Sequence, residues 1–172
     1  CSSDLKLAEE SSLEITDKEL QEYVELAIVN AAKQITKSEK TETEKFDKIK
    51  ELYETQPTIS MRSSERIEKQ QYSTPVPIAF TAGMFAQTGG AKSFLDPSAG
   101  NGMLLINVDG NVIANEIDTT RAENLEKQEY QVRTQDATQP LPFKVDSVLT
   151  NPPFGSMEAK MYGQYKIGRA HV

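Results

Sequence analysis

Apolar residues recur at helical spacing in the first part of the chain, and two capping signals frame them. Thr16 with Glu19, and Thr41 with Glu44, each have the spacing of a capping box. We therefore expect two helices joined by the polar connector 38–45. Their apolar stripes are expected to be packing faces of a helical extension, with a partner-binding surface as the alternative. The stripes comprise Leu20, Tyr23, Val24, Ala27, Ile28, Ala31 and Ile35, then Phe46, Ile49, Leu52 and Tyr53.

A third helix is predicted where a polar, proline-containing stretch ends. Thr74 is placed to cap it, Pro75 suits its first turn, and the pair Gly89–Gly90 would end it. Four residues would form its apolar face: Ile78, Ala79, Met84 and Phe85.

Strands and helices alternate along the rest of the chain. Apolar, β-branched runs predict strands over 92–96, 111–118, 131–137 and 144–150, and a helix over 119–127 separates the second from the third. Such alternation is typical of an α/β fold with a largely parallel sheet.

Charge is unevenly distributed. Residues 1–57 have a net charge of −6, from 8 lysines and 14 acids, out of −7 for the whole chain. No basic surface of the nucleic-acid-binding kind is predicted, so a DNA partner would need phosphate contacts from outside this chain. Cys1 and His171 are the only residues of their types, which excludes a Cys/His zinc site, and we assign no metal. No membrane segment or signal peptide is visible, and we expect a cytoplasmic protein.

Candidate ligand-binding residues fall at the predicted strand ends, where doubly wound sheets bind their ligands. Gly100 and Gly102, in the loop DPSAGNG, would take positive φ and let the backbone approach a ligand closely. Glu116 lies sixteen residues after Gly100, near the spacing of an acid that binds ribose hydroxyls. Asp136 ends the third strand, where its carboxylate could accept from an exocyclic amine. Each feature alone has an ordinary structural explanation, but together they indicate a nucleoside-containing cofactor.

Pro97 narrows the choice of cofactor. It removes a backbone N–H that a pyrophosphate would use. A cofactor without phosphates, such as S-adenosylmethionine, therefore fits better than a dinucleotide.

The stretch Asn-Pro-Pro-Phe follows the fourth predicted strand directly. The lone pair of an aryl amine is delocalised into its ring, so two acceptors on its hydrogens would help it react. The side-chain oxygen of Asn151 and the carbonyl of Pro152, stiffened by Pro153, could be these acceptors. Phe154 could stack on the base. A proline-rich loop with a buried Phe is the alternative.

Taken in order, five motifs resemble those of N6-adenine DNA methyltransferases: QQYSTP (70–75), FLDPSAGNGM (94–103), NEID (115–118), QDAT (135–138) and NPPF (151–154). The pattern is similar to the methylase part of mobile-element methylase–helicase proteins and to type I modification subunits. It covers roughly residues 58–155.

This resemblance implies a Rossmann-like methyltransferase sheet, with S-adenosylmethionine as cofactor and DNA as substrate. Catalysis on a flipped adenine would fall to Asn151, Pro152, Pro153 and Phe154. The cofactor would be bound by Tyr72, Ser73, Thr74, Pro75, Asp96, Pro97, Ala99, Gly100, Gly102, Glu116, Asp136 and Ala137.

The chain departs from the family pattern in its extent. Later strands of the sheet and a target-recognition domain are not found, so we expect an incomplete sheet that ends on an uncovered edge strand. We divide the chain into an acidic helical extension (1–57), the N-terminal part of the methyltransferase domain (58–166) and a non-native tail (167–172). A helicase or recognition domain would complete the protein.

Two alternative functions remain open. Methyltransferases that act on RNA or on a protein glutamine also use an Asn-Pro-Pro-aromatic cluster, although Phe154 and the motif QQYSTP favour DNA. A non-catalytic cofactor-binding or assembly module, docked through its helical extension, is the alternative of another class.

Overall fold

In the part of the chain that the structure describes, four parallel strands form a sheet. The structure, a computed structural model, describes residues 16–56 and 73–152. The strand order is β3-β2-β1-β4, the order of the first four strands of a Rossmann sheet. The predicted α/β class with a Rossmann-like sheet is therefore confirmed. The strands are β1 (Ser93–Asp96), β2 (Asn111–Asn115), β3 (Gln131–Arg133) and β4 (Ser147–Val148).

The strands are shorter than the sequence pattern predicted, most of all β4. Its start is fixed by Asp146, whose Oδ2 accepts from the backbone N–H groups of Lys92 (3.0 Å) and Ser93 (2.9 Å). Its last ladder bond runs from Leu149 N to Leu95 O (3.0 Å). Pro152, three residues later, has no N–H to donate, so the pairing could not continue through it.

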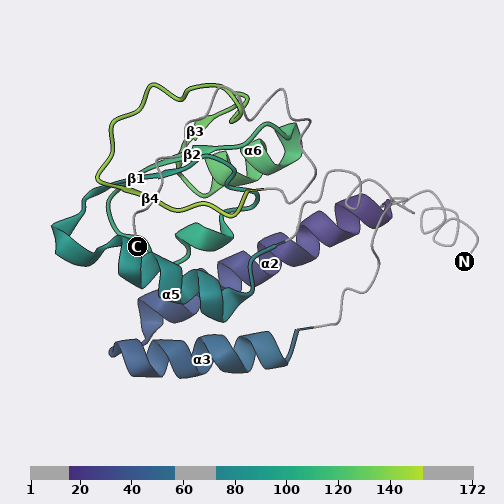
Figure 1. The fold of residues 1–172 in the computed structure, drawn as a ribbon. Coiled ribbons are helices and arrows are strands. Elements are labelled where there is room, and N and C mark those ends of the chain that lie inside the picture. The colour runs from purple at the N-terminus through teal and green to yellow at the C-terminus, as the bar shows by residue number, and fades with distance from the viewer. Residues whose placement is uncertain (1–15, 57–72, 153–172) are drawn as a thin grey trace, which may run out of the picture.

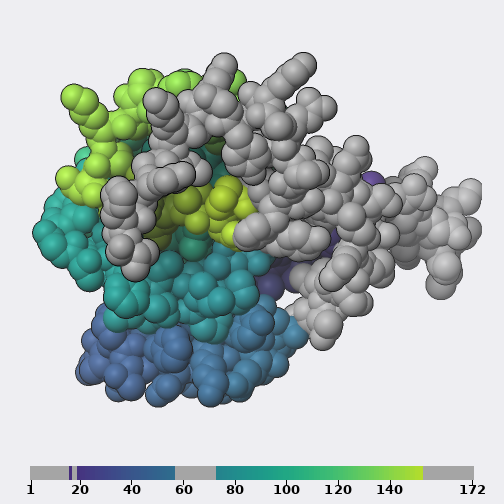
Figure 2. All heavy atoms as spheres, in the orientation of Figure 1, coloured from purple at the N-terminus to yellow at the C-terminus, as the bar shows by residue number. Residues whose placement is uncertain are grey.

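Two helices stack one on the other below the sheet (Figure 1). Helix α5 (Val76–Ala86) lies next to the sheet, and α3 (Glu42–Glu54) packs on the outer side of α5. The ring centroids of Phe46 on α3 and Phe80 on α5 are 6.1 Å apart. Figure 2 shows these two helices as adjacent bands of one surface. The other helical elements are α2 (Asp17–Ser38), α6 (Thr119–Lys127) and the short turns η1 (Thr88–Gly90) and η2 (Met103–Leu105).

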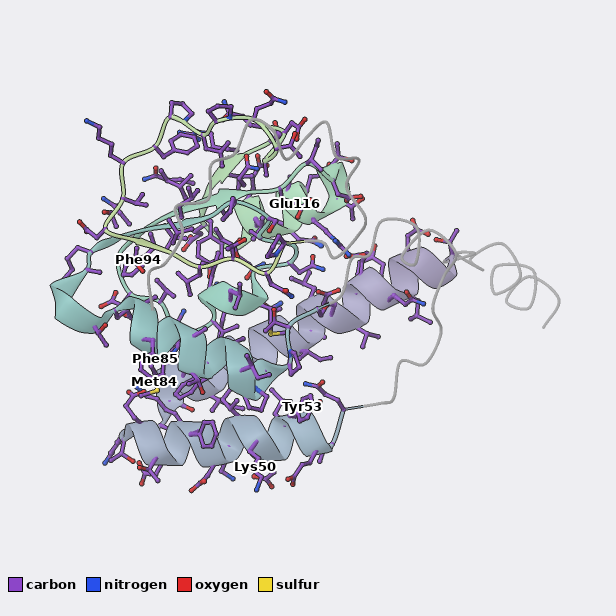
Figure 3. The ribbon with its side chains drawn as sticks, viewed as in Figure 1. Lys50, Tyr53, Met84, Phe85, Phe94 and Glu116 are labelled. Carbon is purple, nitrogen blue, oxygen red and sulfur yellow. The ribbon has the colours of Figure 1, made fainter. Side chains whose placement is uncertain are left out.

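One hydrophobic core joins the N-terminal helices to the sheet. Val29 of α2 and Ile49 of α3 are fully buried in the same cluster as Phe80 of α5, Phe94 of β1 and Leu125 of α6. Burial of each such side chain stabilises the fold by about 1.5–3 kcal/mol. The position of Phe94 on β1 is marked in Figure 3. The proposed boundary at residue 57 stays a prediction, but the two sides of it share this core.

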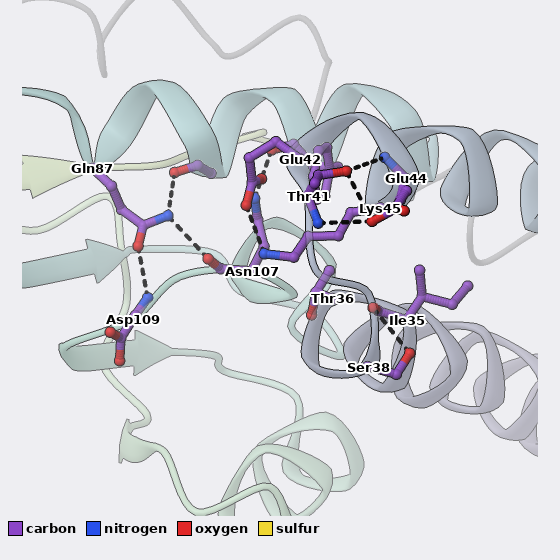
Figure 4. A network of polar contacts seen from close by, with 12 residues as sticks. Ile35, Thr36, Ser38, Thr41, Glu42, Glu44, Lys45, Gln87, Asn107 and Asp109 are labelled. Atoms are coloured by element: carbon purple, nitrogen blue, oxygen red, sulfur yellow. Dashed lines mark hydrogen bonds and ion pairs between the residues drawn. The ribbon is translucent and has the colours of Figure 1, made fainter.

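Both predicted capping boxes are present. Thr16 accepts from the backbone N–H of Glu19 (3.2 Å), and Thr41 from that of Glu44 (3.2 Å); each Glu side chain accepts in return from the Thr backbone. The second box is shown in Figure 4. The predicted connector 38–45 is wrong in extent, because α2 runs to Ser38 and α3 starts at Glu42.

The buried face of α2 differs from the predicted apolar stripe. Leu20 is 53% exposed and Tyr23 is 60% exposed, although Ile28 and Ile35 do pack against the core. In their place, five other residues of α2 are buried: Gln21, Glu22, Glu25, Val29 and Ala32. Two acids can be buried here because partners from other elements hold them, which an apolar pattern cannot indicate.

The predicted face of α5 is also wrong except for Ala79. Ile78 is 60% exposed and Phe85 is 71% exposed, with Met84 also exposed; Figure 3 labels Met84 and Phe85 on this helix. Val76, Ala79, Phe80 and Gly83 are the buried residues. The helix is apolar on all sides, so its sequence gives no strong preference for one face.

Gly83 allows a loop side chain to pack against α5. A Cβ added at Gly83 would overlap the Asn107 side chain, with its Cγ at 2.9 Å. Asn107 donates from Nδ2 to the carbonyl oxygen of Phe80 (2.9 Å), and its backbone carbonyl accepts from Gln87 Nε2 (2.9 Å; Figure 4). The absence of a side chain at Gly83 leaves the space in which Asn107 packs. Asn107 in turn joins α5 to the loop before β2.

We predict that Gly83→Ala lowers the free energy of unfolding by about 1–2 kcal/mol, because the overlap outweighs the better helix propensity of Ala. In the Asn107→Ala background the same substitution should instead stabilise the chain by about 0.5–1 kcal/mol. Urea denaturation of the four proteins measures both effects. An equal effect of Gly83→Ala in the two backgrounds would contradict this packing.

Candidate functional site

The predicted site residues that the structure describes lie toward one edge of the sheet. Because β1 to β4 are parallel, the loops that follow them leave from the same edge. The start of α5 reaches this edge as well, since the Thr74 hydroxyl bonds the Asn151 side chain. Figure 3 labels Glu116 here, just beyond β2.

The loop DPSAGNG has the glycine conformation that the sequence predicted. Gly100 has φ +57° and Gly102 has φ +91°, both in the left-handed region. The loop is tied to β2 by a hydrogen bond from Ala99 N to Asn115 O (2.9 Å), and it closes on itself from Gly102 N to Ala99 O (2.8 Å). No described atom lies within 4 Å of a Cβ built on Gly100, so this glycine borders open space.

Glu116 is buried and joins two turns of the site. Its Oε2 accepts from the backbone N–H of Gly100 (2.8 Å), and its Oε1 accepts from that of Asp118 (2.9 Å). The acid after β2 thus contacts the glycine loop after β1 directly. Each carboxylate oxygen can accept further hydrogen bonds, so both remain able to bind a ligand hydroxyl.

Asp96, the last residue of β1, is almost completely buried. Its Oδ1 accepts from the backbone N–H of Ser98 (3.0 Å). Burial raises the pKa of Asp96 to about 7; the bond from Ser98 opposes this shift, and the nearby charge of Glu116 adds to it. The site therefore contains a carboxyl group that titrates near neutral pH.

Asp136 and Ala137 lie in an exposed turn after β3. Oδ1 of Asp136 accepts from the Thr138 hydroxyl (2.7 Å) and from the Thr138 backbone N–H (2.9 Å), and these two bonds lower the pKa of Asp136. The carboxylate is thus charged and accessible, and it faces solvent rather than another site residue.

Asn115 was not singled out from the sequence, yet it connects two loops to the end of β2. Its Nδ2 donates to the carbonyl oxygens of Pro97 (2.9 Å) and Gln135 (2.8 Å), and its Oδ1 accepts from Gln135 N (2.9 Å). The side chain is fully buried at the end of β2. It fixes the loop after β1 and the loop after β3 relative to the strand between them.

Thr74 does not cap α5 as predicted, and its predicted role in cofactor binding stays a prediction. No side chain caps α5, whose N-cap residue is Pro75. The Thr74 hydroxyl instead accepts from Asn151 Nδ2 (3.0 Å), so the residue before the helix holds the amide that follows β4. The neighbouring hydroxyl of Ser73 donates to Glu25 of α2.

Of the four remaining predicted site residues, the structure describes one, Pro152. Pro152 is exposed directly after Asn151. Tyr72, Pro153 and Phe154 lie outside the described residues, so their predicted roles stay predictions.

Two further residues of this edge were missed by sequence reasoning. Ile117, next to Glu116, is 64% exposed, which is unusual for a large aliphatic side chain directly beyond a buried strand. The hydroxyl of Ser98 in the glycine loop is buried without a hydrogen-bond partner among the described residues. The sequence offered one signal for each of them: Ile117 is an apolar residue next to the acid Glu116, and Ser98 is a polar residue in the glycine loop.

Two searches within 16–56 and 73–152 gave negative results. No group of three or more His, Cys, Asp or Glu side chains is arranged to hold a metal ion there. No helix of these ranges is both long and apolar enough to span a membrane.

Comparison with known proteins gives a structural similarity and no assigned family. No protein-family model matches the chain, and no curated protein matches it. Among solved structures it is similar to the crystal structure of a "putative RNA methyltransferase" from Pyrococcus horikoshii, with 25% identity and a TM-score of 0.48. The match covers 64% of this chain and 61% of that one, so this chain spans less than two thirds of that protein. The function must therefore be argued from the residues of this chain.

The raised pKa of Asp96 predicts a specific pH dependence of stability. The stabilising effect of the protonated carboxyl is fully present below about pH 4 and is lost as the pH rises to about 7. Asp96→Asn keeps the acceptor for Ser98 but cannot ionise. It should flatten the fall in the free energy of unfolding between pH 4 and 7.5, and stabilise the chain at pH 7.5 by on the order of 1–4 kcal/mol.

Asp136→Asn is the matched control, because Asp136 is exposed and its pKa is lowered. It should leave the slope between pH 4.5 and 7.5 unchanged. Urea denaturation at four pH values measures all three proteins. Parallel curves for the original chain and Asp96→Asn would show that Asp96 does not titrate in this window.

Proposed function

We propose that this chain is part of an S-adenosylmethionine-dependent methyltransferase that methylates N6 of a flipped adenine in DNA. The observation that carries the proposal is the hydrogen bond between Thr74 and Asn151 at the same sheet edge as the glycine loop and Glu116. It brings a candidate amine-binding amide and a candidate nucleoside-binding loop to one site.

The residues after β1 fit a cofactor that is positively charged and lacks phosphates. When bound, S-adenosylmethionine supplies a methyl group activated by a sulfonium charge. Glu116, and Asp96 in its ionised form, make this edge acidic, which favours a cation and disfavours a pyrophosphate. Pro97 has no N–H for a phosphate, and the open space beside Gly100 leaves room for close approach of a ligand. The unpartnered hydroxyl of Ser98 is a further group that a ligand could satisfy.

The loops after β2 and β3 would bind the nucleoside part of the cofactor. In this proposal Glu116 accepts from the ribose hydroxyls while it keeps its bond to Gly100. Ile117 offers an exposed apolar surface for one face of the adenine. Asp136, with Ala137 beside it, would accept from the exocyclic amine of that adenine. Asn115 keeps the loop after β3 at a fixed separation from the loop after β1.

Asn151 would act on the target amine. Its Nδ2 is directed to Thr74, so the oxygen of the same amide points away from Thr74. An oxygen held in this way, together with the Pro152 carbonyl, would accept from both hydrogens of a planar amine. As the amine is methylated it gains positive charge, and acceptors already in place stabilise that charge. Pro153 would stiffen the pair and Phe154 would stack on the base, as the resemblance implies.

The motif that precedes α5 would complete the site. The resemblance places Tyr72, Ser73 and Pro75 around the methionine end of the cofactor, with Thr74 between them. The hydrogen bond of Thr74 adds a second role, because it orients the catalytic amide.

The choice of DNA rests on the motif QQYSTP and on Phe154. The chain has a net charge of −7, so contacts to DNA phosphates would come from a recognition or helicase domain of the protein. RNA and protein glutamine are the substrates that a direct assay must separate from DNA.

We predict that Asn151→Ala lowers the rate of methyl transfer by about 10²–10³ and leaves the affinity for S-adenosylmethionine nearly unchanged, because its acceptor acts mainly in the transition state. Glu116→Ala is the complementary variant, and it should weaken cofactor binding by roughly 1–3 kcal/mol.

The assay incubates the protein and labelled cofactor with DNA, RNA and protein pools, followed by nucleoside and amino-acid analysis. The proposal expects N6-methyladenine in DNA. Label in RNA or on glutamine would move the assignment to those substrates. Cofactor binding without label in any pool would favour a non-catalytic module.

A further inference from the structure

Asn101, between the two left-handed glycines, is held from two helices. Its Nδ2 donates to Glu22 Oε2 of α2 (2.8 Å), and its Oδ1 accepts from Asn124 Nδ2 of α6 (3.0 Å). Its backbone carbonyl accepts from Gln128 Nε2 (3.0 Å). Asn101 is fully buried, so these bonds replace water as its partners.

Glu22 forms a buried ion pair with Arg121 of α6. Arg121 donates from Nε to Oε2 (2.9 Å) and from Nη2 to Oε1 (2.8 Å), so both carboxylate oxygens are engaged in a two-pronged contact. Oε2 is shared between Arg121 and Asn101. Burial alone would lower the pKa of Arg121, but the hydrogen bonds and charge of Glu22 outweigh it and raise the pKa above its usual value.

Arg121 fixes the position and orientation of the Glu22 carboxylate, which in turn binds the loop residue Asn101. A planar guanidinium that binds two oxygens sets the orientation of the carboxylate as well as its distance. The orientation of Glu22 in turn sets where the Asn101 side chain lies. Asn101 is between Gly100 and Gly102, which are the loop residues with the least intrinsic conformational restriction.

We propose that Glu22 is a positioning residue for the cofactor site: through Asn101 it holds the glycine loop in its binding conformation. This inference rests on the proposed function, because it assigns the loop to S-adenosylmethionine. It makes α2 part of the site, although α2 lies far from the motifs in sequence. A loop ordered in advance loses less entropy on binding, so the effect falls on cofactor affinity rather than on the chemical step.

Two sets of variants test the proposal. The first removes the ion pair as a unit, Glu22→Ala with Arg121→Ala, so that no buried charge is left alone. The second, Asn101→Ala, keeps the pair and removes its link to the loop together with the hydrogen bond from Asn124. Combining them gives a cycle, because a pair that acts through Asn101 should have little further effect once Asn101 is replaced. The matched control is removal of the exposed α3 pair, Lys48→Ala with Glu51→Ala.

Two readouts are compared in this set. Hydrogen exchange of the Gly100 and Gly102 amides, both hydrogen-bonded in the structure, is measured without cofactor. Calorimetry then measures the Kd for S-adenosylmethionine. We expect each test variant to speed exchange of these amides at least tenfold and to raise Kd about tenfold, with non-additive effects in combination. The α3 control should change neither quantity.

The outcomes separate this inference from the proposed function. Unchanged exchange and unchanged Kd in Asn101→Ala would overturn the positioning role, as would additive effects in the cycle. If the ion-pair variant fails to fold, Asn101→Ala still decides the question. A third outcome is that the variants exchange faster but the original chain does not bind S-adenosylmethionine. This would support the role of Glu22 and Asn101 in holding the loop, and it would refute the assignment of the cofactor.

Discussion

The side-chain amide of Asn115 is the constraint on which the arrangement of this sheet edge depends. A parallel sheet brings the ends of its strands together, but it does not fix the loops that follow them. Asn115 does so with three hydrogen bonds, to Pro97 and to both backbone groups of Gln135. Because the amide is fully buried, losing either loop would leave polar atoms without partners. Glu116, the next residue, continues this connection by bonding Gly100.

The parts of the fold that local chemistry determines were predictable from the sequence. Capping boxes at Thr16 and Thr41 marked helix starts, and apolar β-branched runs marked all four strands, because these signals act within a few residues. Which face a helix buries was not predictable. The burial of Glu22 depends on Arg121, 99 residues away in sequence, and α5 is apolar all round. Both outcomes are decided by tertiary contacts that no local pattern contains.

The candidate site also has some features that local sequence predicted and others that depend on tertiary contacts. The positive φ of Gly100 and Gly102 and the place of Glu116 directly after β2 agree with the sequence prediction, whereas Asp136 lies beyond the end of β3 at Arg133 and does not end that strand as predicted. The link from Thr74 to Asn151 could not be predicted, because the two are 77 residues apart and Thr74 had a plausible local role as a helix cap. Together these contacts make the edge acidic, hydrogen-bonded and accessible at Gly100, which suits a cationic nucleoside cofactor.

The most direct test of this interpretation is a calorimetric titration of the chain with S-adenosylmethionine and, in parallel, with a nicotinamide dinucleotide. Both ligands contain adenosine. S-adenosylmethionine carries a positively charged sulfonium, whereas the dinucleotide carries a negatively charged pyrophosphate. An acidic edge with Pro97 in its loop predicts saturable binding of S-adenosylmethionine and none of the dinucleotide. Binding of the dinucleotide, with no heat from S-adenosylmethionine, would contradict it.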